Sequence, residues 1–409
     1  MIMPLGVPIC WVLGLGELTW AFTAAPMALL LAARWHRVRV PPMFALWLLF
    51  LAWTAIAVVG IDSVPRLVGF AVRALLYLAA TVTFVYVYNL APASDPIRTL
   101  ARSMTYLWVV VVVGGYLGVL FPGLTLTTPM AYLLPGSITS NEVVREMVYP
   151  STTQGNPEGY FDLALRPSAP FLYTNNWGNA YSVLLPFVLV FLERSRRDRA
   201  WTFVAVLLPL SVVPALLTLN RGMFVALGLG MAYAAVRLLS RGYTRALAAL
   251  TTLAVVVLVL SQLVPVASLL DQRLSEGASN ESRLNVYAAT WERTLDSPVL
   301  GYGAPRTVQI GAPALGTQGQ FWMVLFSSGI PGATLFVAWF AWATLRSFPA
   351  PDTSRTWLHV VIAMTTLEIF YYGILGPGLV IAMVAIALVT RPAPGLPARH
   401  GSVERRPRL

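Results

Sequence analysis

Residues 103–121 read SMTYLWVVVVVGGYLGVLF, a stretch of 19 residues without a charged side chain. An α-helix of that length is about 29 Å long, which matches the ~30 Å hydrocarbon core of a bilayer. Similar blocks recur along the chain, and 57% of its 409 residues are apolar while only 11% are charged. So few polar residues cannot cover a soluble protein of this size. The sequence therefore predicts an all-α, polytopic integral membrane protein.

Eleven apolar blocks, within a range of ten to twelve, are long enough to cross a membrane. They lie at residues 10–33, 42–60, 68–88, 103–121, 176–192, 201–219, 222–239, 246–266, 319–343, 357–373 and 375–390. The first block has prolines in and around it, so it forms either one long tilted helix or a broken pair, and we expect one helix. The chain then divides into helices 1–121, a large loop 122–175, helices 176–266, a second large loop 267–318, helices 319–390 and a basic tail 391–409.

The arginines predict the orientation of these helices. All 28 basic residues are arginine, and their clusters fall on alternate connections. The positive-inside rule assigns those connections to the cytoplasmic side, with the N-terminus outside and both large loops on the outer face. The inner side then holds 19 arginines against 5 acidic residues, and the outer side 7 against 10. We expect the net charge of +11 to attract anionic membrane lipids, and we expect no nucleic-acid partner.

The residue types that are missing exclude several activities. Without lysine the chain has no Walker-type ATP site and no Schiff-base chemistry. A single cysteine, Cys10, excludes an intramolecular disulfide and a thiolate zinc cluster. No paired-aspartate motif or His/Cys cluster is present to bind a divalent metal, so we expect neither a metal nor another cofactor.

The first candidate motif is Thr218-Leu-Asn-Arg-Gly222, at a tight outer turn between two apolar helices. Arg221 offers a bidentate guanidinium for a diphosphate, and Gly222 lets the backbone approach closely. The alternative is an interfacial arginine that extends to lipid headgroups.

The second motif begins at Asn280, which predicts a helix that ends before Pro298 and is followed by Gly301-Tyr-Gly303. Arg283, Tyr287 and Trp291 then share one face, and an arginine in the first turn of a helix favours an anion. The alternative is an amphipathic helix that lies on the membrane.

Two further motifs stand where the large loops return to the membrane. The stretch from Arg166 to Asn179 leads into the fifth predicted span, and Asn176 in it is suited to cap that helix and to bind sugar hydroxyls. The stretch Gly316-Thr-Gln-Gly-Gln-Phe-Trp322 leads into the ninth span and carries Gln318 and Gln320. On its own, this last motif indicates no function.

In this order and on these connections, the four motifs resemble those of the O-antigen ligase and O-antigen polymerase family of membrane glycosyltransferases, over roughly residues 160–345. The resemblance implies a metal-independent enzyme of the plasma membrane with its active site facing outside. Such an enzyme transfers a glycan from a polyprenyl-diphosphate-linked donor onto a glycan or glycolipid acceptor during cell-surface polysaccharide assembly. It implies that Arg221 and Arg283 hold the diphosphate and that Gln318 stands at the catalytic position. Expected substrate-binding residues are Arg73, Arg166, Asn176, Tyr287 and Gln320.

The chain departs from the ligases of this family at one important position. Ligases usually carry a histidine at the motif where this chain has Gln318. His36, His359 and His400 all fall on the predicted inner side. This difference favours a polymerase type or a divergent transferase, and it leaves the general base open among the outer carboxylates of Glu142, Glu146, Glu158, Asp162, Glu276 and Glu281.

Three charged residues, Glu17, Arg73 and Glu368, lie within predicted spans, and they allow functions other than glycan transfer. Arg73 either forms a salt bridge with Glu17 or Glu368, or reaches the donor diphosphate as a third arginine. Alternatively, the three form the pathway of a lipid-linked sugar transporter or flippase. A third possibility is a non-catalytic membrane scaffold whose outer loops bind a partner.

Overall fold

The structure is a computed structural model that describes residues 2–91, 95–139, 142–154, 165–244, 248, 251–252, 254–255, 258–259, 279–306 and 314–391. It is mostly helical, at 74% helix. Within these residues the structure also contains a short two-stranded antiparallel sheet, which the predicted all-α fold did not include. Its strands are β1 (Thr153–Gln154) and β2 (Arg166–Pro167). Most of the predicted span 246–266 and nearly all of the basic tail lie outside the described residues.

Among the described residues, four helices are long and apolar enough to cross a membrane, namely α4 (Val64–Tyr88), α5 (Pro96–Leu120), α12 (Arg221–Leu239) and α16 (Gln320–Ser347). The structure also contains shorter apolar helices, which are α1 (Ile2–Leu13), α2 (Thr19–Ala32), α3 (Phe44–Ile56), α10 (Trp201–Leu210), α11 (Val212–Leu217) and α18 (Pro377–Thr390). The more polar helices of the bundle are α9 (Thr174–Arg194) and α17 (Thr353–Glu368). These helices support the assignment of the chain as a membrane protein. The count of eleven spans stays a prediction.

The first large loop contains α6 (Pro129–Leu133), α7 (Gly136–Thr139) and α8 (Glu142–Val148), and the second contains α15 (Ser279–Asp296). The predicted helix of the second loop is confirmed, since α15 ends two residues before Pro298.

The single helix expected at residues 10–33 is wrong. The chain forms α1 and α2, with a break at Gly14, whose φ is +82°. At that position a Cβ would overlap the side chain of Thr128 from the first large loop. The left-handed turn is open to glycine without strain, so the helix stops there and a second one starts after it.

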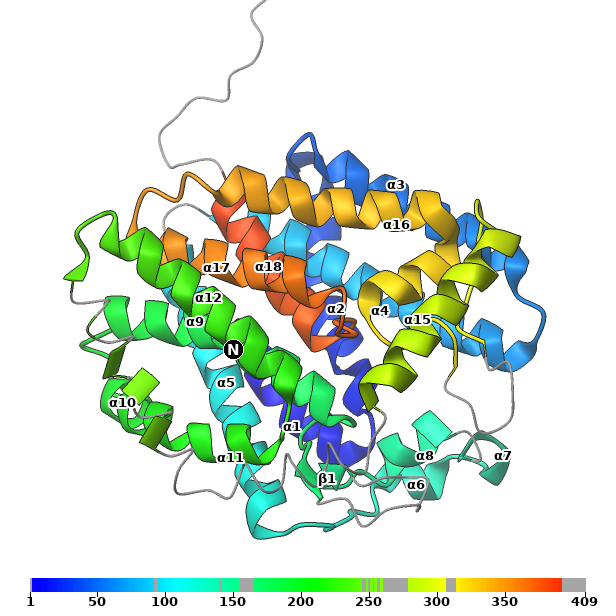
Figure 1. Ribbon diagram of the computed structural model, residues 1–409, viewed down its shortest axis with the longest axis horizontal. Helices are drawn as coiled ribbons and strands as arrows, with labels where there is room; N and C mark the ends of the chain where they lie inside the picture. Colours follow the sequence, from blue (N-terminus) through cyan, green and yellow to red (C-terminus); the bar gives the residue numbers. More distant parts are fainter. Residues whose placement is uncertain are drawn as a thin grey trace, which may run out of the picture.

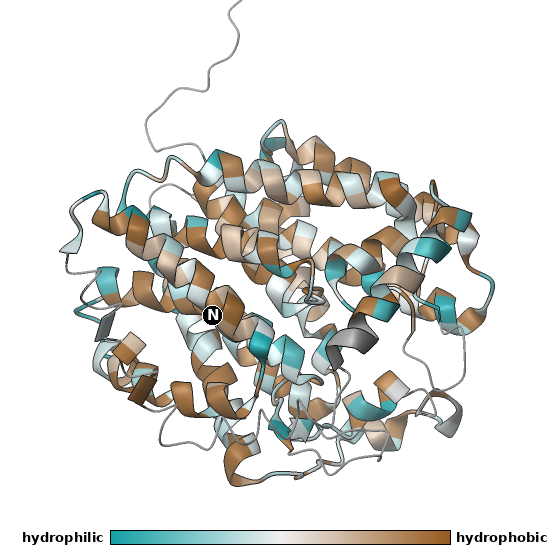
Figure 2. Cartoon of the chain, in the orientation of Figure 1, coloured by the Kyte–Doolittle hydropathy of each residue, from teal (hydrophilic) through white to brown (hydrophobic). Residues whose placement is uncertain are grey.

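Helix α18 is the centre of the bundle (Figure 1). Every residue from Pro377 to Val389 is buried, and the helix packs against α4, α9, α16 and α17. Figure 2 shows apolar residues along the helices, with hydrophilic residues gathered at helix ends and connections. A helix that is apolar all round is stable only in such a central position.

The charged residues sort to two ends of the bundle, in agreement with the arginine pattern. At one end Arg194 pairs with Asp95 at 3.1 Å and with Asp352 at 3.6 Å, which joins three connections predicted on the inner side. At the other end Arg66 pairs with Asp62 at 2.5 Å, and its hydrogen bond holds the pKa of Asp62 below the usual value. Connections predicted on the same side of the membrane therefore contact one another.

Helix α16 is interrupted at Gly329, where φ is +66° and ψ is −173°. The interruption frees backbone groups on both sides, and residues 298–303 of the second loop bind them. The amides of Tyr302 and Gly303 donate to the carbonyl oxygens of Phe326 at 2.9 Å and Ser327 at 2.8 Å, and Ile330 N donates to Pro298 O at 2.8 Å. In an apolar bundle each such unpaired group would cost several kcal/mol.

Arg66 and Trp53 complete this junction. Arg66 donates to the carbonyl oxygens of Tyr302 at 2.6 Å and Ala304 at 2.8 Å. The indole NH of Trp53 lies 3.0 Å from the carbonyl oxygen of Ser328. The predicted Gly301-x-Gly303 motif is therefore a structural clasp on α16.

We predict that Gly301→Ala destabilises the protein by about 2 kcal/mol or more. Its φ is +66°, and a Cβ there would lie 2.6 Å from the carbonyl oxygen of Phe326. The measurement is Tm of the purified protein in detergent. Gly228→Ala in α12, where a Cβ meets open space, is the matched control and should leave Tm unchanged or raise it. Equal Tm values for the two variants would contradict this account of the clasp.

Candidate functional site

The start of α9 lies against the Asn220-Arg221 turn. The side-chain amide of Asn220 donates to Thr174 O at 3.2 Å, and Gly178 leaves room for that amide. Gln154 of the first large loop accepts a hydrogen bond from Thr174 N at 2.9 Å, so it supplies the cap that we expected from Asn176. Asn176 instead lies in the first turn of α9, half-buried. The first and third sequence motifs are thus neighbours.

Tyr372, in the turn between α17 and α18, joins this turn to the fourth motif. Its hydroxyl donates to Oδ1 of Asn220, and its carbonyl oxygen accepts from Gln320 N at 2.7 Å. Tyr372 has no sequence signal for this role, because a tyrosine at the end of an apolar span normally indicates only a membrane-interface anchor.

Gln320 is fully buried, and its side chain bonds within the protein. Its Nε2 donates to Tyr77 OH at 2.7 Å, and its Oε1 accepts from Leu375 N at 3.1 Å. These bonds tie α16 to α4 and to the turn before α18, and the predicted substrate-binding role of Gln320 stays a prediction.

Tyr287 joins the second motif to the fourth. Its ring stacks on Trp322 with centroids 4.5 Å apart, and its hydroxyl donates to Gln318 O at 3.0 Å. Arg283 lies one helical turn before Tyr287 on α15, and its side chain is outside the described part of the chain. The side-chain amide of Gln318 is half-buried and has no hydrogen-bond partner among the described residues. It is therefore free to bind a ligand.

The backbone beside Arg221 is strained. Leu219 has φ +50°, and it is the one non-glycine residue with positive φ in the described ranges. Such strain gathers at functional sites. Arg221 is the first residue of α12, and the start of a helix favours an anion through its dipole. Arg166 is half-buried in β2, next to the start of α9.

Arg73 lies one turn from Tyr77 on α4 and lines a small cavity of about 10 Å³, together with Thr54, Ser327 and Ser328. It forms no ion pair and no hydrogen bond within the described ranges, so neither Glu17 nor Glu368 neutralises it. The hydroxyl of Ser327 is also buried without a hydrogen-bond partner there. An unpaired arginine among apolar helices is costly. The salt bridge that the sequence allowed is absent, and the anion-binding alternative remains.

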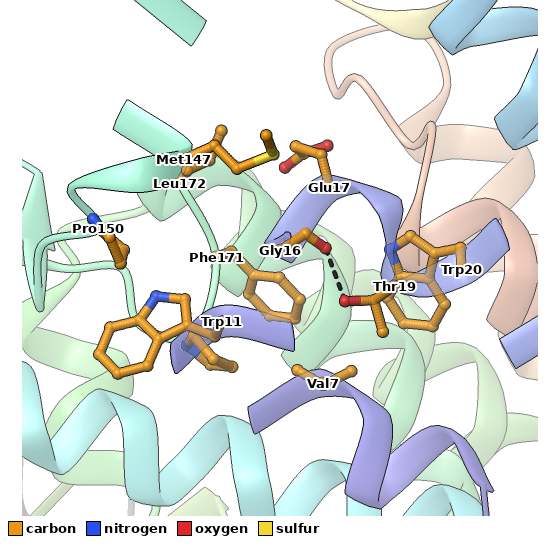
Figure 3. A pocket seen from close by; sticks show the side chains of 11 residues that line it. Val7, Trp11, Gly16, Glu17, Thr19, Trp20, Met147, Pro150, Phe171 and Leu172 are labelled. Atoms are coloured by element: carbon orange, nitrogen blue, oxygen red, sulfur yellow. Dashed lines mark hydrogen bonds between the residues drawn. The ribbon is translucent and has the colours of Figure 1, made fainter. Parts of the chain in front are cut away.

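The two intramembrane carboxylates have separate surroundings. Glu368 is fully buried and accepts hydrogen bonds from Asn179 Nδ2 and Ser182 Oγ, both at 2.6 Å. Glu17 lies at the α1–α2 break and lines a different pocket with Trp11, Trp20 and Phe171 (Figure 3). They therefore do not form one charged cluster with Arg73.

No described group of three or more His, Cys, Asp or Glu residues is placed to hold a metal ion. His359 is buried on α17, where its ring nitrogens lie 2.7 Å from the hydroxyls of Tyr233 and Ser347. His36 is exposed on the arginine-rich end of the bundle, and His400 is outside the described residues. Of the six outer carboxylates offered as general bases, Glu146 has a described side chain, and it is half-buried on α8.

No family model matches the chain, and a comparison with curated proteins found no match. The resemblance to the O-antigen ligase and polymerase family accordingly stays a prediction from the motifs.

We predict that Tyr372→Phe lowers stability by about 1–3 kcal/mol, because it leaves Oδ1 of Asn220 buried without its donor. Tm of the purified variant in detergent is the measurement. The adjacent Tyr371→Phe is the control, since the Tyr371 hydroxyl makes one long contact of 3.5 Å to Gly222 O. If Tyr371→Phe proved the more damaging change, the link between Asn220 and Tyr372 would not have the importance given to it here.

Proposed function

We propose that the protein is a membrane glycosyltransferase that transfers or polymerises a glycan from a polyprenyl-diphosphate-linked donor onto an acceptor hydroxyl. The observation that carries this proposal is the continuous set of contacts from Thr174 through Asn220, Tyr372 and Gln320, with Gln318 joined to α15 by Tyr287. Four motifs separated by about 150 residues of sequence meet along this path, which supports one shared site.

The chemistry needs cations at the leaving group. Attack of an acceptor hydroxyl on the anomeric carbon expels a diphosphate, whose growing negative charge arginine binds through paired, charge-assisted hydrogen bonds. Arg221 and Arg283 carry this task in the proposal. Arg73, unpaired beside Tyr77, is the third cation, and its place on an apolar helix suits a lipid-borne anion that approaches from the side.

The proposed location is the plasma membrane, with eleven spans and the site on the outer face. The separation of arginine clusters to one end of the bundle supports this orientation. The site lies at the other end, where the starts of α12 and α15 point toward the same side of the molecule as β1 and α8 (Figure 1).

We predict that Arg221→Ala and Arg283→Ala each abolish transfer, and that lysine at either position restores little because it lacks the bidentate fork. The measurement is the accumulation of lipid-linked oligosaccharide in a deletion strain that carries each variant. Gln318→Ala should lower the rate about fivefold, as expected for one neutral hydrogen bond.

The matched control is Arg293→Ala, which removes an exposed arginine of α15 that pairs with Asp296 at 3.2 Å. It should leave transfer unchanged. Normal transfer by both alanine variants at Arg221 and Arg283, with normal protein yield, would refute the proposed donor site.

The orientation predicts which positions an impermeant thiol reagent reaches in intact cells. In a Cys10→Ala background, Tyr132→Cys in α6 should be labelled and Ser240→Cys after α12 should not. Both side chains are exposed in the structure, so accessibility alone does not separate them. Labelling at position 240 with none at 132 would invert the topology.

A transporter of lipid-linked sugars is the second candidate, and the interrupted helix α16 favours it, because transporters bind substrates and ions at such breaks. Against it, the freed groups at this break are bonded to Tyr302, Gly303 and Pro298. The purified protein in detergent separates the two functions. A transferase forms the glycosidic bond there, and a transporter does not.

A further inference from the structure

A groove of about 670 Å³ opens at the end of the bundle opposite the candidate site. Its apolar wall comes from Leu30 and Leu31 of α2, with Val38 and Leu90, and its charged rim from Arg34 and Arg37. α4 connects the two ends. It carries Arg73 near one and Tyr86 of the groove near the other, 13 residues and about 20 Å apart.

The groove is held open by a specific contact. Asn89 accepts a hydrogen bond from Arg39 N at 2.8 Å and donates to Arg39 O at 2.7 Å. It also donates to Val85 O at 2.8 Å. These bonds fix the connection after α2 against the end of α4, so the groove does not depend on a ligand for its shape.

The arginines around the groove lack acidic partners. Arg34 and Arg37 are exposed, and their side chains form no ion pair or hydrogen bond among the residues described. Arg39, Arg346 and Arg391 all act electrostatically on Tyr88 at the last turn of α4. None of the five has an ion pair in the described ranges, although Arg102 and Arg194 at the same end of the bundle do.

One of these arginines has a buried atom without a partner. Arg391 donates through Nη2 to Leu90 O, beside the groove, while its Nη1 is buried and has no hydrogen-bond partner in the described residues. Arg391 thus adds positive charge beside the groove, and a cationic rim attracts an anion with several acceptor oxygens.

We propose that this groove is a binding site for one anionic phospholipid, with the phosphate between Arg34 and Arg37 and an acyl chain along Leu30, Leu31 and Leu90. Positive charge attracts the headgroup, and the apolar wall selects a ligand with a hydrocarbon chain over a soluble anion. The chain's own tail is a poor occupant, because residues 392–409 carry four arginines against one glutamate and are repelled by the rim. The site is separate from the proposed donor site.

Native mass spectrometry of the purified full chain, titrated with phosphatidylglycerol or phosphatidylcholine, tests this site. We expect phosphatidylglycerol to bind in preference to phosphatidylcholine, and Arg34→Ala/Arg37→Ala to weaken its binding at least about tenfold. The control is Arg196→Ala/Arg197→Ala, which removes two exposed arginines from the same end of the bundle without touching the groove. It should bind phosphatidylglycerol as the unaltered protein does.

Any of the following results would overturn the proposal. One is an equal loss of phosphatidylglycerol binding in the control pair, which indicates a general charge effect. Another is unchanged binding by the groove pair. A further one is full displacement of the lipid by excess inorganic phosphate, which indicates a soluble anion. The pair Arg34→Gln/Arg37→Gln keeps long polar side chains, so it separates charge from packing. Weak binding by the glutamine pair supports the site, and normal binding rejects it.

Discussion

The break in α16 imposes the constraint on which the candidate-site half of the structure depends. Backbone groups freed inside an apolar bundle have no water to bind, so another segment must supply the partners. Residues 298–303 do so, and this fixes the second large loop against α16. α15 immediately precedes that segment, so the same clasp sets where Tyr287 meets Trp322 and Gln318. The geometry of the candidate site is thus a consequence of how a broken helix satisfies its hydrogen bonds.

The length of the apolar blocks predicted the helical class, and the spacing of the arginines predicted which connections lie at the same end of the bundle. Both patterns reflect the membrane and the water around it, so they depend on no particular tertiary contact. Helix breaks were harder to predict. Gly14 and Gly329 stand in stretches whose hydropathy is continuous, and their left-handed backbone depends on Thr128 and on residues 298–299 that pack there. A hydropathy pattern does not register such contacts.

The motifs identified residues that meet, but did not show the structural contacts that some of them make. Gln320 and the Gly301-x-Gly303 segment each bond to backbone or side-chain groups within the protein. Tyr372 connects two motifs and carries no distinguishing sequence signal. Arg73 shows the opposite case. Its isolation is visible in the structure alone, because the sequence supplied two acidic residues, Glu17 and Glu368, as equally good partners for it.

The central position of α18 has a consequence for the order in which the bundle is completed. α4 and α9 are synthesised well before it, yet both bury their inner faces against it. Until α17 and α18 are inserted, Asn179 and Ser182 on α9 lack the carboxylate of Glu368 to which they donate. Polar side chains in that state face lipid at a cost. The growing chain must therefore keep α4 and α9 apart, or shelter their polar faces at the insertion machinery, until the segment that separates them has emerged.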